Sequence, residues 1–306
     1  MTLEALAKTT TVRKIVCPFS PGGISDKLSR VLALEAAQLT GDTWYVQNIT
    51  GAGGLVGSNE VALSEPNGQT LLFSPTGVFR TRGGQEDNRS RVVLVRDLEP
   101  NIIFGAMPLV CVMRADQVRP NLRTYLAGLR ASGAPLIYAT SGHGSTAHFM
   151  GAYIAKRHQL ASVHVPFAGS LPTVTAVLGG HVPFAIVDPM LVFEKIKNGY
   201  LHALAISSSS REPRLPMTYT LLEQGLSTVE FTSWQGLLLP SATPAPIKAS
   251  ATDLFLTLSK SEQVKKVLHE AFIQSVPLTG ARVQTFFHND HRLFQALMLD
   301  LQIAIQ

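Results

Sequence analysis

The chain has 306 residues, of which 45% are hydrophobic and 15% are charged, and its formal net charge is +5. This length suits two domains of about 150 residues, and the composition excludes a disordered chain. No apolar run approaches the ~18 residues that a membrane-spanning helix requires. The basic residues are scattered without interleaved aromatics, which argues against a nucleic-acid partner. The densest basic stretch, Arg80 to Arg96, also contains Glu86 and Asp87 and is interpreted as a solvated loop.

The first third of the chain repeats a β-branched strand, a turn of small residues and a helix, which is typical of α/β domains. Strands are expected over residues 12–19, 44–48 and 70–73, with a helix after each of the first two. The first helix should end near Thr40, because Gly41 suits the left-handed position that follows a helix. Its buried face is expected to contain Leu28, Val31, Leu32 and Leu39.

The second half repeats this design and predicts a second α/β unit. Strands are expected over residues 136–140, 163–167, 182–187 and 201–206, and the apolar run Pro108 to Met113 is expected to join the two units. The helix that follows Thr146 should bury Ala147, Met150, Gly151 and Ile154, which recur at helical spacing. Residues 233–240 look like a strand that returns to the first unit, and a helical tail completes the chain. Trp234 is expected either to pack at a hinge or to line a cleft.

These elements predict an α/β fold with two lobes, each a mostly parallel sheet flanked by helices. Residues 1–110 and 232–306 would form a discontinuous lobe 1, and residues 111–231 would form lobe 2. A ligand cleft is expected between the lobes, because ligands of open α/β sheets bind at the carboxyl ends of the strands.

Two turns, Ser20 to Asp26 and Ser141 to Thr146, carry the strongest signal for a ligand site. Each joins a strand to the start of a helix, where unpaired N–H groups and the helix dipole favour an anion. Glycine lets a ligand approach the backbone, and hydroxyl groups either cap the helix or donate to an oxygen. For a single turn, an ordinary strand–helix connection is the alternative. Several such turns together favour a small organic carboxylate.

Turns that follow other strands complete the expected site. The expected ligand-binding residues are Ser20, Gly22, Gly23, Ile24, Ser25, Asp26, Ser74, Thr76, Gly77, Ser141, His143, Gly144, Ser145, Thr146, Phe167, Ala168, Gly169 and Asp188. The simplest interpretation of Asp26 is a partner of the helix dipole, and Asp188 either faces a ligand amine or accepts from nearby backbone N–H groups. A structural role is slightly favoured for both aspartates.

Enzyme interpretations find less support. The loop Gly51 to Gly57 resembles a dinucleotide fingerprint, but Val56 occupies the position of its third glycine. No nucleophile elbow and no metal-ligand spacing are present, so no catalytic residue, cofactor or metal is expected. A serine hydrolase that uses Ser145 with His143 or His148 is the main alternative, although no acidic partner lies nearby in the sequence. A ligand sensor for a signalling partner is a further alternative.

The two cysteines, Cys17 and Cys111, lie in separate apolar runs and are expected to be buried free thiols. The N-terminal residues Met1 to Ala5 lack the features of a signal peptide. Either a cytosolic protein or one whose leader is absent from the sequence is compatible with this.

At these turns the chain resembles the Bug-type extracytoplasmic solute receptors of tripartite tricarboxylate transporters. The resemblance covers about Arg13 to Ala304, and the matching pieces come in family order. They are Pro18 to Gly23 with Asp26, Asn48 with Gly51 to Gly54, Asn67 to Leu72, Ser141 to Ser145 with His148, Val165 to Phe167 with Gly169, Leu178 to Gly180, and Thr243 to Pro246.

The resemblance implies a periplasmic, monomeric Venus-flytrap protein that captures a dicarboxylate, acidic amino acid or aromatic carboxylate for membrane permease subunits. It also implies that the signal peptide is absent from this sequence. The family often has Tyr-Lys-Gly where this chain has Phe167, Ala168 and Gly169. This departure removes a possible cation and, with the bulky Ile24, points to an aromatic or less charged ligand.

Overall fold

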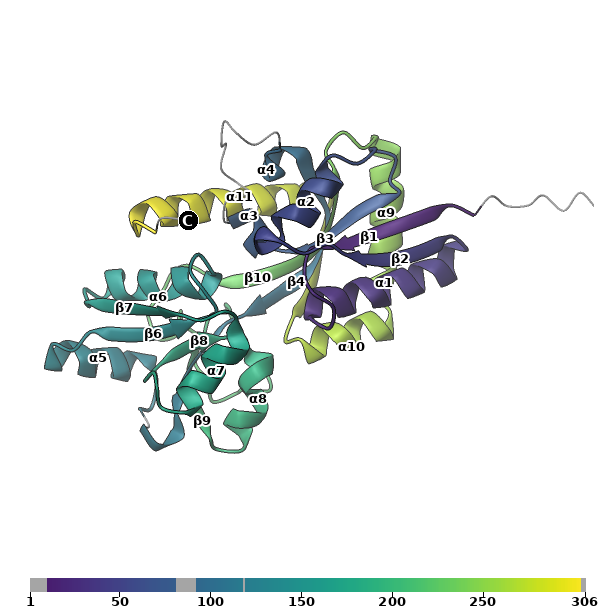
Figure 1. The fold of residues 1–306 in the computed structure, drawn as a ribbon. Helices are drawn as coiled ribbons and strands as arrows, with labels where there is room; N and C mark the ends of the chain where they lie inside the picture. The colour runs from purple at the N-terminus through teal and green to yellow at the C-terminus, as the bar shows by residue number, and fades with distance from the viewer. Residues whose placement is uncertain (1–9, 81–91, 118, 304–306) are drawn as a thin grey trace, which may run out of the picture. The chain divides into compact units, whose positions relative to one another are not determined.

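The computed structural model describes residues 10–80, 92–117 and 119–303. The chain divides into two compact units (Figure 1). Unit 1 contains the chain up to Gly105 together with Gln235–His269 and Ser275–Asn289. Unit 2 contains Ala106–Trp234, Glu270–Gln274 and the chain from Asp290 onward. Most of the basic stretch expected to be a solvated loop, residues 81–91, lies outside the described residues, as do residues 1–9.

The elements alternate between strands and helices along most of the chain. The strands are β1 (Val12–Cys17), β2 (Thr43–Asn48), β3 (Thr70–Pro75), β4 (Leu98–Pro108), β5 (Val110–Arg114), β6 (Leu136–Thr140), β7 (Ser162–Pro166), β8 (Ala185–Val187), β9 (Leu201–Ile206), β10 (Thr232–Pro240) and β11 (Gln274–Thr279). The helices are α1 (Ile24–Thr40), α2 (Leu55–Ala62), α3 (Gly77–Arg80), α4 (Leu94–Asp97), α5 (Leu122–Ser132), α6 (Thr146–Arg157), α7 (Ser170–Leu178), α8 (Pro189–Lys197), α9 (Ala245–Leu258), α10 (Glu262–Glu270) and α11 (Gly280–Asp300).

Unit 1 is built on a six-stranded sheet with the order β11-β4-β10-β3-β1-β2. Strand β1 pairs in parallel with both β2 and β3, whereas β10 pairs antiparallel with β3. Residues 233–240 therefore return to the first sheet as expected. The carboxyl ends of β1 and β3 lie side by side at one edge, which positions the loops that follow them.

Helix α1 buries only part of the apolar face that the sequence predicts. It ends at Thr40, and Gly41 adopts the expected left-handed conformation with φ +75°. Leu28 and Leu32 are fully buried, but Leu39 is 57% exposed, so its placement on the buried face was wrong. The buried stripe instead continues through Ala36, because small residues let the helix approach its neighbours closely.

Unit 2 is built on a five-stranded sheet with the order β7-β6-β8-β5-β9. Strand β6 pairs in parallel with β7 and β8, whereas β5 runs antiparallel to β8 and β9. One face carries a core formed with α5, α6 and the end of α11, and the other packs against α7 and α8. As expected, α6 buries Ala147, Met150, Gly151 and Ile154.

The structure confirms a two-unit α/β fold, but both sheets are mixed where mostly parallel sheets were expected. The apolar run 108–113, which was expected to join the units, contains the last residue of β4 and most of β5, and the chain passes from unit 1 to unit 2 just before it, after Gly105. The expected strand 182–187 is shorter and spans Ala185–Val187. Trp234 is fully buried, and its Nε1 donates to Asp290 in the same unit. Cys17 and Cys111 are buried and free, as expected.

Among the described residues, no helix combines the length and apolar character needed to cross a bilayer.

Candidate ligand-binding site

In unit 1, an exposed loop joins β1 to α1 at the carboxyl edge of the sheet. Residues 20–23 are exposed, and Ile24 begins the helix half-buried. Gly23, the residue before the helix, has an extended backbone with φ −75° and ψ 174° and provides no side-chain cap. The first N–H groups of α1 therefore have neither an intrahelical acceptor nor a capping side chain, and they form a potential anion site.

Asp26 holds this loop in place. Its carboxylate accepts hydrogen bonds from Gly22 N (2.9 Å), Arg30 Nε (3.0 Å) and Asn48 Nδ2 (2.9 Å). Burial alone would raise the pKa of Asp26, but the hydrogen bonds from Arg30, Gly22 and Asn48 outweigh burial and lower the pKa. Asp26 is thus an ionised residue whose acceptor positions are used by the protein, and its part in the site is to shape the loop. Gly22 has φ +93°, which favours glycine.

Ser25 turns inward and does not extend toward the exposed loop. It is 8% exposed, and its hydroxyl donates to Gln235 Oε1 at 3.1 Å. Gln235 is 4% exposed and lies opposite Pro75 in the pairing of β10 with β3. Gln235 is a positioning residue that the sequence alone did not reveal, because it is 210 positions away from Ser25.

The turn after β3 lies at the same edge as the loop after β1, because the two strands are parallel neighbours. Ser74 and Thr76 are both fully buried, and Ser74 Oγ donates to the carbonyl of Pro75. Pro75 and Gly77 are half-buried. The Ser74 and Thr76 side chains therefore pack inside the unit, while Pro75 and Gly77 are partly accessible.

In unit 2, three loops meet at one edge because β6 is flanked by two parallel strands, β7 and β8. Gly169 N donates to Ser141 O at 3.1 Å, and Phe167 N donates to Thr140 O at 3.0 Å. Asp188 follows β8 at the same edge. His143 and Ala168 are exposed, while Ser141, Phe167, Gly169 and Thr146 are half-buried. The predicted residues of the second unit are thus brought together.

Ser145 is used as a helix cap. Its Oγ donates to Gly142 O at 2.8 Å and accepts from His148 N at 3.2 Å. The neighbouring Gly144, which is buried, donates its N–H to His148 Nδ1 at 3.1 Å. The hydroxyl proton of Ser145 therefore points to a carbonyl and not to a histidine, which removes the arrangement that a serine nucleophile requires.

Replacing Ser145 by alanine should lower the free energy of unfolding by about 1 kcal/mol, because the start of α6 would lose its cap. Urea denaturation of Ser145→Ala measures this loss. Ser162→Ala, at the exposed start of β7, is the matched control and should unfold like the parent chain. Equal stability of the two variants would contradict the capping role.

A stack of aromatic rings lies behind this loop. The His148 and His164 rings are parallel with centroids 3.8 Å apart, His143 lies 4.6 Å from His148, and Tyr138 lies 5.1 Å from His164. Burial, followed by the nearby histidines, lowers the pKa of His148 to about 3 and that of His164 to about 4. Both rings are therefore neutral at pH 7, consistent with Nδ1 of His148 acting as an acceptor.

The two depressed histidine pKa values make stability depend on pH. Between pH 6.5 and 4 the unfolded chain binds protons that the folded chain does not, so the free energy of unfolding should fall as the pH is lowered through this range. Allowing for partial exposure of the rings, we expect these two histidines to contribute a loss on the order of 2 kcal/mol from pH 7 to pH 4. Urea denaturation at several pH values tests this expectation.

The control compares two histidine-to-asparagine variants. His148→Asn keeps an acceptor near the position of Nδ1 and should lose much of the pH dependence. His181→Asn, on an exposed histidine of the same unit, should keep it. Parallel pH profiles for both variants and the parent chain would contradict a contribution from the stack.

Asp188 contributes the acidic group at this edge. It accepts a hydrogen bond from Ser170 Oγ at 2.7 Å. Burial raises the pKa of the Asp188 carboxyl, and the hydrogen bond from Ser170 only partly offsets this. No cation of the described chain forms an ion pair with Asp188. Nor do the described residues contain a group of three histidine, cysteine or acidic side chains that could hold a metal ion.

Comparison with known proteins identifies relatives that match most of the chain. The family model described as tripartite tricarboxylate transporter family receptor matches residues 28–298. Protein BugT from Bordetella pertussis is 32% identical over 234 residues, which are 76% of this chain and 72% of BugT. A protein encoded in the tcbD-tcbE intergenic region of Pseudomonas sp. strain P51 is 30% identical over 233 residues, or 76% of this chain and 69% of that protein.

Solved structures share the fold. A TctC solute-binding protein from Polaromonas superposes with a TM-score of 0.82 at 22% identity, covering 96% of this chain and 99% of that chain. Two proteins from Rhodopseudomonas palustris also match: Rpa4515 with adipate (TM-score 0.77, 22% identity, 97% and 99% coverage) and MatC with bound malate (TM-score 0.71, 23% identity, 98% and 100% coverage). At these identities the similarity establishes the fold alone, and it confirms the predicted two-lobed class.

Proposed function

Because the chain belongs to the family of tripartite tricarboxylate transporter receptors, which are solute-binding proteins and not enzymes, we propose that it captures a small organic carboxylate in the periplasm and delivers it to membrane permease subunits. The observation that carries this proposal is the uncapped start of α1 behind the exposed loop 20–23. A carboxylate there would accept hydrogen bonds from backbone N–H groups without needing an arginine. The names of two fold neighbours record malate and adipate, so carboxylates suit this fold.

The edge of unit 2 narrows the class of ligand. No cation of the described chain forms an ion pair with Asp188 or lowers its pKa, so a second ligand carboxylate beside it would meet the like charge of the ionised form without compensation. A neutral, aromatic or hydrogen-bond-donating group of the ligand would not be repelled by Asp188. We therefore favour a ligand with one carboxylate and an apolar or donor-bearing remainder, in which Phe167 and Ile24 would contact the apolar part.

Capture would use both units. In the proposed mechanism, loop 20–23 of unit 1 binds the carboxylate first, and the loops 141–146 and 167–170 of unit 2 bind the remainder when a hinge closes. Closure would be favoured by the additional contacts that only the closed state makes. The closed complex is then the form that a permease would recognise.

The experiment is native mass spectrometry of the purified protein, followed by a thermal-shift screen of mono-, di- and aromatic carboxylates. A ligand at a hundredfold excess over its Kd should stabilise the folded state by about 2.7 kcal/mol. A screen without any stabilising carboxylate would contradict the proposal. Co-purification with a signalling protein and not with a permease would instead favour the sensor alternative.

A further inference from the structure

Unit 2 contains a cavity of about 400 Å³ that is separate from the candidate site. Its walls come from α8, from β9 and from the segment Arg214–Thr218, and His202 is one of its lining residues. In the antiparallel pairing with β5, Leu201 lies opposite Arg114, while Ile206 lies opposite Val110. Val110 in turn lies opposite Val187, next to Asp188. The end of β9 at Ile206 is thus the end nearest to the candidate site, and His202 lies four residues, or about 13 Å, away from it along the strand.

The chemistry of the walls is apolar with positive charge. Phe193, Ile196, Leu215 and Met217 provide apolar surface, and the charged lining residues are Lys197 and Arg214, with no carboxylate among the lining residues. A cavity of this size and character is typical of a small-molecule site. Its charges favour an anion.

The two cations differ in how they are held. Arg214 donates to Glu212 at 2.7 Å, and its guanidinium lies 3.3 Å from the centroid of the Phe272 ring, so its position is fixed. Lys197 is the last residue of α8 and is exposed, and within the described chain it forms no ion pair. Lys197 is thus the cation whose charge is most available to a ligand.

Two lining residues are incompletely satisfied in the folded chain: one lacks a hydrogen-bond partner and the other lacks apolar packing. The Nε2 atom of His202 is buried, and the described residues offer it no hydrogen-bond partner. Met217 is 83% exposed although it is a large apolar side chain. A ligand with an apolar body would cover Met217 and remove its apolar surface from water.

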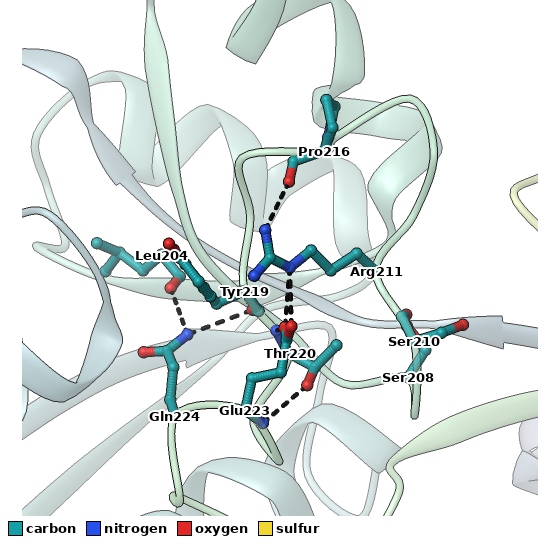
Figure 2. Close-up of polar contacts among 9 residues, drawn as sticks. All are labelled: Leu204, Ser208, Ser210, Arg211, Pro216, Tyr219, Thr220, Glu223 and Gln224. Carbon is teal, nitrogen blue, oxygen red and sulfur yellow. Dashed lines mark hydrogen bonds and ion pairs between the residues drawn. The ribbon is translucent and has the colours of Figure 1, made fainter.

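The loop that carries Met217 is held rigidly, so the cavity does not need a ligand to form. Figure 2 shows Arg211 donating to both carboxylate oxygens of Glu223 and to the carbonyl of Pro216. The Arg211 guanidinium also lies 3.9 Å from the centroid of the Tyr219 ring. A preformed wall lowers the entropy cost of binding.

Gln224 attaches the far end of the same loop to the sheet. Its Nε2 donates to the carbonyls of Leu204 and Tyr219, as Figure 2 also shows. Leu204 belongs to β9, the strand that forms the floor of the cavity through His202 and Ala203. Loop and floor are therefore parts of one hydrogen-bonded framework.

We infer that this cavity is a second ligand site, which binds an amphipathic organic monoanion with its apolar body against Phe193, Ile196 and Met217 and its charge beside Lys197. The site is independent of carboxylate capture at the strand edges. It would let a second small molecule bind this receptor without competing for the transported one.

The probe for this site is 8-anilinonaphthalene-1-sulfonate, an amphipathic aromatic monoanion, titrated into the full chain and followed by fluorescence and calorimetry. We expect saturable binding at one site. Met217→Glu and Lys197→Glu should each weaken binding at least about tenfold, since each places a negative charge at the cavity. Both side chains are exposed, so neither change should affect folding.

Each variant has a matched control. Leu222→Glu changes another exposed apolar residue of the same loop, and Lys195→Glu changes a lysine of the same helix that donates to its own turn at Leu191 O. Both controls should bind the probe within about twofold of the parent chain, as should Gly23→Glu, which alters only the carboxylate loop. Absence of saturable binding, or equal loss in variants and controls, would overturn the inference.

Discussion

A Gly23→Glu variant should lose carboxylate binding by at least about 100-fold, or roughly 2.7 kcal/mol, while remaining folded. The position accepts a side chain, because a Cβ at Gly23 would meet nothing closer than Ser20 O at 3.9 Å and the backbone is extended. A glutamate there would put its own carboxylate at the N–H groups of α1, where an anion also stabilises the helix. Stability should thus be unchanged or higher although the ligand is excluded.

Calorimetry with the carboxylate selected by the thermal-shift screen measures this effect. Gly23→Gln adds nearly the same volume without charge and should weaken binding by less than about tenfold. Gly128→Glu places the same charge on an exposed helical glycine of unit 2 that has open space around it, and should bind normally. Unchanged affinity in Gly23→Glu would exclude loop 20–23 from the site.

The features that the sequence predicted best are turns and helix ends, which depend on the chemistry of a few neighbouring residues. Turns rich in glycine and serine marked the ends of β1 and β6, and Gly41 marked the end of α1, because these residues adopt backbone conformations that others disfavour. Those signals located the loops at the strand edges. They also led to the family that the comparisons confirm.

What the sequence did not reveal depends on pairing between distant segments. Strand β4 contains two prolines and a glycine, which obscured it as a strand although most of its residues are buried. The contact between Ser25 and Gln235 and the stacking of His148 on His164 follow from sheet order, which no local pattern encodes. The burial of Ser74, at the end of β3, and of Thr76, just after it, likewise follows from packing that the local sequence does not encode.

The two strand edges differ in how they present the start of a helix. In unit 1, α1 begins without a side-chain cap, and Asp26 keeps its loop open. In unit 2, Ser145 already satisfies the first turn of α6, and the titratable group at the edge is Asp188. In the proposed function, the uncapped helix start of unit 1 is therefore assigned to the carboxylate, and the edge of unit 2 to the remainder of the ligand.

Asp188→Asn should increase the affinity for dicarboxylates about tenfold, or roughly 1.4 kcal/mol, relative to the parent chain. The amide keeps an oxygen that can accept from Ser170 Oγ but removes the like charge that a second ligand carboxylate would meet. Because burial raises the pKa of Asp188, stability is lost as the pH rises from the ordinary value of 3.8 through the raised pKa, and the variant should therefore also be more stable at neutral pH. Calorimetry with malate and adipate, together with urea denaturation, measures both effects.

Asp253→Asn makes the same charge change at an exposed position of α9 and should alter neither affinity nor stability. Monocarboxylates provide the internal comparison, because their affinity should change less than that of dicarboxylates when the charge of Asp188 is removed. A uniform gain for all carboxylates would indicate a long-range effect of net charge. Weaker binding of an amine-bearing acid to Asp188→Asn, with no gain for malate or adipate, would instead assign Asp188 to an ammonium group. Either result would contradict the proposal that Asp188 selects against a second carboxylate.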